Sequence, residues 1–391
     1  MIRIETQFLI GLNRILLLAI GLWPYQQSRL TQFQFNLFFT ILMTCIIFQL
    51  TTFITALKYT SDLVVAVLSP TSFLTVFIII YLAFRVNIET VKELLIQLQH
   101  VCNELRDKNE IAIIEKYGYI SKCYTVALIV AGICASLNFI QFWTLSDDVL
   151  STNVTRSHCM QFVTEYFVDQ EKYFFLILLH INIAFSIGGT AMIATGAMGI
   201  AFFKFFCGMF QISSYRIERA VKIIQQNITL KNKILKSEDL ISAIDLHRQV
   251  IRLSKYFISK FEIMFFCLAH IFVISLCFNF AHIFQIVLSE QATKKALWPM
   301  MFAASNILYL FISNSLGQNM TDHNNYVFDT VYRVEWYVTP LHIQRIILFL
   351  LLKGAKIFTM NVGGLFTPSL ECFAMLVKAS VSYFTVILST Q

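Results

Sequence analysis

The chain has 391 residues, of which 57% are hydrophobic and only 14% are charged, and its formal net charge is +7. Soluble proteins carry about 25% charged residues, so this composition excludes an ordinary soluble domain and indicates an integral membrane protein. The nine cysteines show no paired spacing that would predict a disulfide framework or a metal site. We also find no phosphate-binding loop, no nucleophile elbow and no metal-binding helix motif, and therefore expect no cofactor and no enzymatic activity.

Residues 1–24 form a short apolar run that ends at Trp23-Pro24 and carries Arg3, Glu5 and Arg14. The run lacks the small-residue cleavage site of a signal peptide. We therefore expect an interfacial helix that leads into the first membrane span.

Seven later stretches are long and apolar enough to cross a hydrocarbon core of about 30 Å. A further apolar run, Ile346 to Leu352, is too short to cross and is bounded by Arg345 and Lys353, so we expect it to be buried in protein. The predicted fold class is an all-α membrane protein with seven transmembrane helices and a cytoplasmic helical anchor bundle. The predicted spans are 33–57, 63–84, 122–145, 173–203, 261–288, 297–316 and 368–390.

The distribution of positive charge predicts the orientation of these spans. Most of the 30 Lys and Arg residues lie in the N-terminus and in the loops after spans two, four and six. Because short cytoplasmic loops are enriched in Lys and Arg, we expect a cytoplasmic N-terminus and an extracellular C-terminus. The loop from Ser146 to Lys172 is acidic and contains the glycosylation sequon Asn153-Val154-Thr155, which suits the external face.

The segments expected in the cytoplasm carry helical patterns of their own. Asn87 to Lys122 places Val91, Leu94, Leu95, Leu98, Val101, Cys102 and Leu105 at three- and four-residue steps, and Ser237 to Phe261 repeats this pattern with Leu240, Ile241, Ile244, Val250, Ile251 and Leu253. Both patterns predict amphipathic helices. With Tyr326 to Met360 they would form a bundle whose apolar faces serve assembly between subunits. We therefore divide the chain into a ligand-binding bundle of spans one to six with long cytoplasmic helical extensions (1–316), a cytoplasmic anchor segment (317–363) and a last transmembrane helix expected to line a pore (364–391).

The last helix has an unusual face. A helix entry at Thr367-Pro368-Ser369 is followed by a strip of small or mildly polar residues at helical spacing. Such a strip either lets helices pack closely in lipid or lines a pore, and the pattern alone leaves both open. The strip consists of Met375, Ala379, Ser382, Val386 and Thr390.

The C-terminal residues resemble the insect odorant receptor family. The resemblance is carried by Trp336, Pro340, Gly364-Leu365-Phe366-Thr367, Ser369-Leu370-Glu371, Phe373 and Ser382-Tyr383-Phe384, and residues 365–391 are similar without gaps to the last helix of the family's co-receptor. It implies a ligand-gated, non-selective cation channel built as a tetramer, with the pore constriction at Val386 and Thr390. Because Thr390 replaces a larger apolar residue of the co-receptor, the resemblance implies an odorant-tuning subunit that works in a heterotetramer with the co-receptor at the plasma membrane of sensory dendrites.

An odorant needs a closed aromatic cavity with one or two polar groups. Span three presents Ser136, Phe139 and Trp143 on one helical face, a spacing that matches the family's pocket residues. By depth alone, the other spans would add Phe73, Phe77, His180, Phe185, Met301, Phe302 and Ser305. His180 would either contact ligand or be a hydrogen-bonded structural group. The expected partners are the co-receptor, a small volatile odorant, permeating cations and membrane lipid, with no nucleic acid. The alternatives are a metabotropic seven-helix chemoreceptor and a gustatory-type receptor channel.

Overall fold

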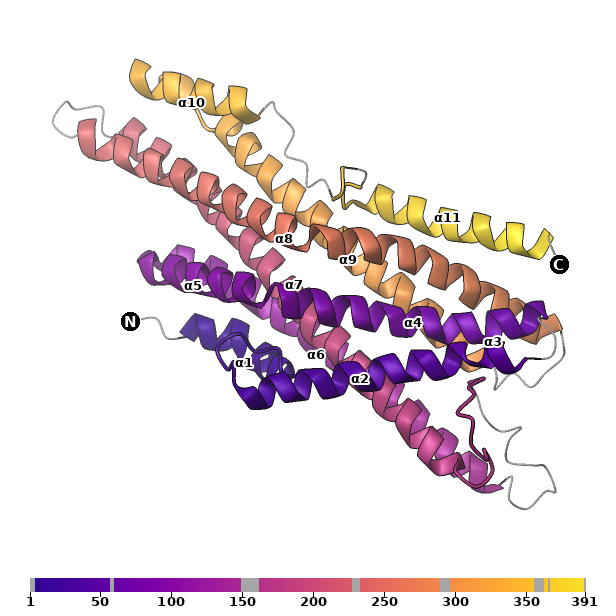
Figure 1. Cartoon of the computed structure of the whole chain (residues 1–391). Helices are drawn as coiled ribbons and strands as arrows, with labels where there is room; N and C mark the ends of the chain where they lie inside the picture. Colours follow the sequence, from indigo (N-terminus) through magenta and orange to yellow (C-terminus); the bar gives the residue numbers. More distant parts are fainter. Residues whose placement is uncertain are drawn as a thin grey trace.

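The computed structural model describes residues 4–56, 60–148, 162–226, 233–288, 296–354, 362–364 and 366–389, and these residues are almost entirely helical (Figure 1). The one pairing of extended backbone in this part of the chain joins Val362 to Phe366, around the positive-φ residues Gly363 and Gly364. The helices are α1 (Ile4–Ala19), α2 (Arg29–Leu50), α3 (Thr52–Thr55), α4 (Ser61–Val86), α5 (Ile88–Glu104), α6 (Lys108–Asp148), α7 (Phe174–Gln226), α8 (Lys233–Leu288), α9 (Leu297–Arg333), a 3-10 turn η5 (Trp336–Val338), α10 (Leu341–Gly354) and α11 (Leu370–Ser389).

The predicted count of spans is confirmed. Within the described residues, seven helices are long and apolar enough to cross a membrane, and they are α2 with α3, α4, α6, α7, α8, α9 and α11. Helices α5 and α10, the start of α8 and the end of α9 gather at one end of the molecule, and the C-terminal end of α11 lies at the other (Figure 1). The chain is therefore a multi-pass membrane protein with a helical bundle extending beyond the spans at one end.

Two helices are much longer than a membrane is thick. Helix α7 has 53 residues and α8 has 56, which corresponds to about 80 Å and about 84 Å at 1.5 Å per residue. The amphipathic segment predicted at Ser237 to Phe261 is therefore the first part of α8 and not a separate helix. Helix α9 likewise continues from Leu297 to Arg333, across the boundary that we placed at residue 316.

The amphipathic pattern after span two is confirmed, but it forms two helices. All the apolar positions named for this segment, from Val91 to Leu105, are buried. The helix breaks at residues 105–107, where the Asp107 carboxylate accepts a 2.9 Å hydrogen bond from the Asn109 backbone N–H and thereby begins α6. The apolar spacing ends at Leu105 and residues 106–110 are all polar, so the sequence carries a signal for this break.

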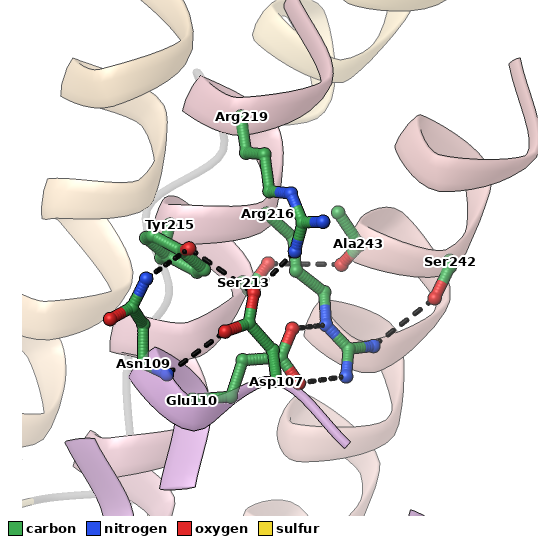
Figure 2. Close-up of polar contacts among 9 residues, drawn as sticks. All are labelled: Asp107, Asn109, Glu110, Ser213, Tyr215, Arg216, Arg219, Ser242 and Ala243. Carbon is green, nitrogen blue, oxygen red and sulfur yellow. Dashed lines mark hydrogen bonds and ion pairs between the residues drawn. The ribbon is translucent and has the colours of Figure 1, made fainter. Parts of the chain in front are cut away.

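Ion pairs at the start of α6 fasten it to α7, and α7 is in turn bonded to α8 (Figure 2). The Arg216 guanidinium donates two hydrogen bonds to the Glu110 carboxylate, at 2.6 Å and 2.8 Å, and a third of 3.1 Å to the Ser242 hydroxyl. Next to this ion pair, the Asp107 carboxylate forms a second ion pair with the Arg219 guanidinium. The backbone hydrogen bond from Asn109, with contributions from the nearby arginines, lowers the pKa of Asp107, so this carboxylate stays charged at neutral pH.

Part of the expected cytoplasmic core is exposed. Ile241 was predicted on the buried face of α8, yet it is 45% exposed. The run from Ile346 to Leu352, predicted to be buried, lies in α10, where Ile347 and Leu350 are buried but Phe349 and Leu352 are 63% and 74% exposed. Within a single chain that half of the run is not buried, because an apolar run seven residues long covers the whole circumference of a helix while α10 meets the rest of the chain on one side.

Candidate functional site: an aromatic cavity beside the last helix

The bundle encloses a cavity of about 640 Å³, within the size range of small-molecule sites. It extends along α9 from Trp298 to Leu316, which is about 27 Å at the helical rise. Residues of α1, α4, α6, α7, α8, α9 and α11 contribute to its wall. Among the lining residues that the structure describes, none carries a charge, so the cavity suits a neutral, mostly apolar molecule.

Most of the residues predicted for ligand contact meet in this cavity. The lining includes Phe73, Phe77, Ser136, Phe185, Met301, Phe302 and Ser305. Phe139 and Trp143 lie in α6, but their side chains fall outside the described part of the structure. His180 is not among the lining residues. Its ring is instead hydrogen-bonded to the Thr44 hydroxyl at 3.1 Å and to the Tyr166 hydroxyl at 2.8 Å.

Aromatic rings form one end of the cavity. Phe302 stacks on Phe73 with ring centroids 4.6 Å apart and on Phe185 at 5.5 Å. Phe77 meets the edges of Phe73 and Phe185, at 4.9 Å and 6.2 Å. Because each such pair contributes about 0.5–1.5 kcal/mol beyond its buried area, the cluster holds its shape without a ligand.

The polar lining consists chiefly of hydroxyl groups that are bonded to their own helices. Ser136, Thr190 and Thr195 donate to backbone carbonyls of α6 and α7 at 2.7–2.8 Å. Since each hydroxyl oxygen keeps acceptor capacity after donating its proton, these groups suit a ligand that donates a hydrogen bond.

Glycines on α7 give the cavity much of its width, and our sequence reasoning did not single them out for this. Gly189, Gly196 and Gly199 all line the cavity, and a Cβ atom added at any of them would meet nothing within 4 Å. Gly188 is different, because a Cβ there would lie 1.9 Å from the Phe77 ring. The sequence signal that could have revealed the other three is their spacing, because Gly189, Gly196 and Gly199 lie seven and three residues apart and therefore share one face of α7.

A buried polar network lies next to the cavity and joins α4, α8 and α9. The Ser275 hydroxyl accepts hydrogen bonds from Ser72 at 2.9 Å and from the Asn306 amide at 2.8 Å, while Ser69 donates to Asn279 at 2.8 Å. Hydrogen bonds between helices in a membrane contribute on average about 0.6 kcal/mol each. The network therefore fixes the register of three helices whose neighbouring residues line the cavity.

The far end of the cavity reaches α11. Pro368, Cys372 and Leu376 line it, and the latter two belong to the buried face of α11 that packs on α8 and α9. Met375 and Val386 are 57% and 56% exposed on this chain. Ser382 is also exposed, Ala379 is half-buried, and Thr390 lies outside the described residues. The described residues of the predicted strip thus lie away from the centre of the buried face.

The comparisons with known proteins agree with one another. A family model described as 7tm Odorant receptor matches residues 60–381. A structure of the insect olfactory receptor OR5 from Machilis hrabei in complex with eugenol superposes with a TM-score of 0.82 at 14% identity, covering 99% of each chain. A second structure of the same receptor gives a TM-score of 0.78 at 15% identity and covers 98% of each chain. Comparison with curated protein sequences found no match.

Proposed function

The chain belongs to the 7tm odorant receptor family, and from this membership we propose that it is the odorant-binding subunit of a ligand-gated, non-selective cation channel. In this proposal the subunit binds a small volatile molecule in the cavity and opens a pore formed by α11 helices. The channel is a heterotetramer with the family's co-receptor in the plasma membrane of sensory neurons. The cavity of about 640 Å³ is the observation that carries the proposal.

The chemistry of the cavity supports an odorant as the ligand. Its uncharged, aromatic-rich wall favours a neutral molecule that partitions out of water, and its hydroxyl acceptors favour one that donates a hydrogen bond. The contacts would come from Phe73, Phe77, Phe185, Met301 and Phe302, with Ser136 and Ser305 as the polar groups. The receptor from Machilis hrabei, whose fold this chain shares, has a structure in complex with eugenol, a small organic molecule, which agrees with a ligand of this size.

Helix α11 supports the channel part of the proposal. It is apolar and lies on the flank of the bundle (Figure 1). Met375, Ser382 and Val386 are exposed on it. Four such faces around an axis would give a pore whose wall alternates small hydroxyl and apolar side chains, with Ala379 and Thr390 on the same strip. Because the cavity also touches Cys372 and Leu376, on the face of α11 that adjoins the strip, a ligand there would act directly on the pore helix.

Helix α10 supports assembly. The helix lies at the end of the bundle away from the C-terminal end of α11 (Figure 1). Phe349 and Leu352 are exposed on it. Apolar side chains in a net positive segment beyond the membrane are costly to leave in water, so we assign them to contacts between subunits.

Expression of the chain with and without the co-receptor tests the proposal. We expect an odorant-evoked cation current in cells that express both subunits and none in cells that express this chain alone, with surface labelling showing equal delivery to the membrane. A lasting odorant-evoked current from this chain alone would contradict the role of a tuning subunit. Odorant-evoked second-messenger signals without current would instead support a metabotropic receptor.

A further inference from the structure

A loop segment closes the aromatic end of the cavity. Residues 162–170, which we call the loop strap, precede α7, and Phe162 within it is buried, with 7% of its surface exposed. Its ring stacks on Phe185 at 5.3 Å and on Phe302 at 6.3 Å, and it meets Trp298 at 5.8 Å. All three of these partners line the cavity, whereas Phe162 itself stands behind them.

The loop strap is fastened to α2 as well as to α7. The Glu165 backbone N–H donates to the Phe48 carbonyl at 2.9 Å, and the Thr51 hydroxyl donates to the Glu165 carbonyl at 2.8 Å. The Tyr166 ring stacks on Phe48 with centroids 4.2 Å apart. Its hydroxyl also bonds to His180, so the histidine that we predicted as a possible ligand contact instead holds the strap.

From these contacts we propose that the loop strap covers the ligand cavity and that Phe162 is its positioning residue. Phe162 holds Phe185, Phe302 and Trp298 in place and thereby sets the length of the longest ligand that the cavity accepts. This inference rests on the proposed function for the identity of the ligand. Removing the Phe162 ring leaves the three lining rings without support on one side and opens the cavity toward the loop. Ligands that are too long for the closed cavity then gain space, while short ligands lose contact.

The first test measures closure without any odorant. Ser305→Cys places a thiol in the cavity wall, and its modification by a membrane-impermeant thiol reagent is followed by mass spectrometry on the purified full chain in lipid nanodiscs. We expect Phe162→Ala to accelerate this modification by about tenfold, which corresponds to about 1.4 kcal/mol. Phe167→Ala is the matched control, because Phe167 lies in the same strap but is 62% exposed. Equal modification rates for the two variants would overturn the proposal.

The second test measures selectivity with para-cresol and its longer-chain alkyl homologues on cells that also express the co-receptor. We expect Phe162→Ala to move the preferred homologue to a longer chain, Phe162→Leu to give an intermediate preference, and Phe167→Ala to keep that of the unmodified chain. If Phe162→Ala fails to reach the surface, Tyr166→Phe, which removes the bond to His180, is expected to shift the preference in the same direction. An unchanged order of preference in both variants would refute the role of Phe162. If no homologue evokes a current, the proposed function fails, and the modification rates still decide whether the strap covers the cavity.

Discussion

At the residue scale, the ligand cavity owes its shape to glycines, which have no side chain, as much as to the side chains that line it. Gly189, Gly196 and Gly199 leave open space along one face of α7, and Gly188 lets Phe77 pack directly on the helix backbone. Gly in the interior of a helix lowers its stability by about 0.5–1 kcal/mol relative to Ala, so each of these glycines destabilises α7. The proposed function accounts for that cost at α7, because the space would then be part of a binding site.

A glycine on α7 gives a test at this scale. We expect Gly188→Ala to change odorant potency by about tenfold, since the added methyl group displaces the Phe77 ring from the cavity wall. Gly11→Ala on α1, which does not line the cavity, should change potency much less, because its methyl group meets nothing within 4 Å. Dose–response curves with the co-receptor, normalised to surface expression, measure both. Equal shifts for the two variants would show that Phe77 does not transmit the effect.

Residue by residue, the sequence predicted what helical spacing and depth can reveal. It placed Phe73, Phe77, Phe185 and Phe302 at a similar depth within their spans, and the structure brings these rings together. It could not place Phe162, because no periodic pattern connects a loop residue to the helices it packs against. It left His180 with two alternatives, since only the fold shows that Thr44 and Tyr166 come within hydrogen-bonding distance of it.

At the scale of elements, the junction between α9 and α11 is a close contact between backbones near the cavity. A Cβ atom added at Gly317 would lie 2.4 Å from Pro368 Cβ and 2.8 Å from its carbonyl oxygen. Beside this contact, the Ser369 backbone N–H donates to the Asn314 side chain at 3.3 Å. The start of α11 is therefore held directly against α9, which carries Phe302 and Ser305 of the cavity.

Gly317→Ala is expected to disturb gating more than ligand binding. The added methyl group would push the first turn of α11 away from α9, because a backbone carbonyl cannot move aside as a side chain does. We expect a changed current without odorant or a reduced maximal current, while the concentration for half-maximal response moves by less than about threefold. Gly11→Ala on α1, where an added Cβ meets nothing within 4 Å, is the control. A large shift in potency with normal maximal current would contradict this account.

The elements themselves were more predictable than their ends. Seven spans follow from hydropathy, and all seven are present among the described residues. Helical extensions beyond the spans were expected from amphipathic spacing such as that from Ser237 to Phe261, because hydropathy alone reports where a helix leaves the lipid and carries no information on whether the helix stops there. The break at residues 105–107 was missed because residues 87–122 were treated as one helix, although residues 106–110 are all polar.

For the molecule as a whole, the positive-inside pattern predicts a cytoplasmic N-terminus and an extracellular Gln391. An epitope added after Gln391 should bind antibody on unpermeabilised cells, whereas one placed before Met1 should bind only after permeabilisation. The reverse result would favour a metabotropic receptor and remove the basis for assigning α11 to a pore. Either outcome is independent of the identity of the odorant.

The uninterrupted length of α8 has a mechanical consequence. Helix α8 is one continuous helix that lines the cavity, contacts α11 and continues into the bundle beyond the membrane, so it acts as one stiff rod. A rod of about 84 Å that pivots by about 2° at one end moves its other end by about 3 Å. Under the proposed function, a displacement smaller than a methyl group beside the ligand would therefore be amplified at the distant subunit contacts, so such a receptor would need no hinge in this helix to report what it has bound.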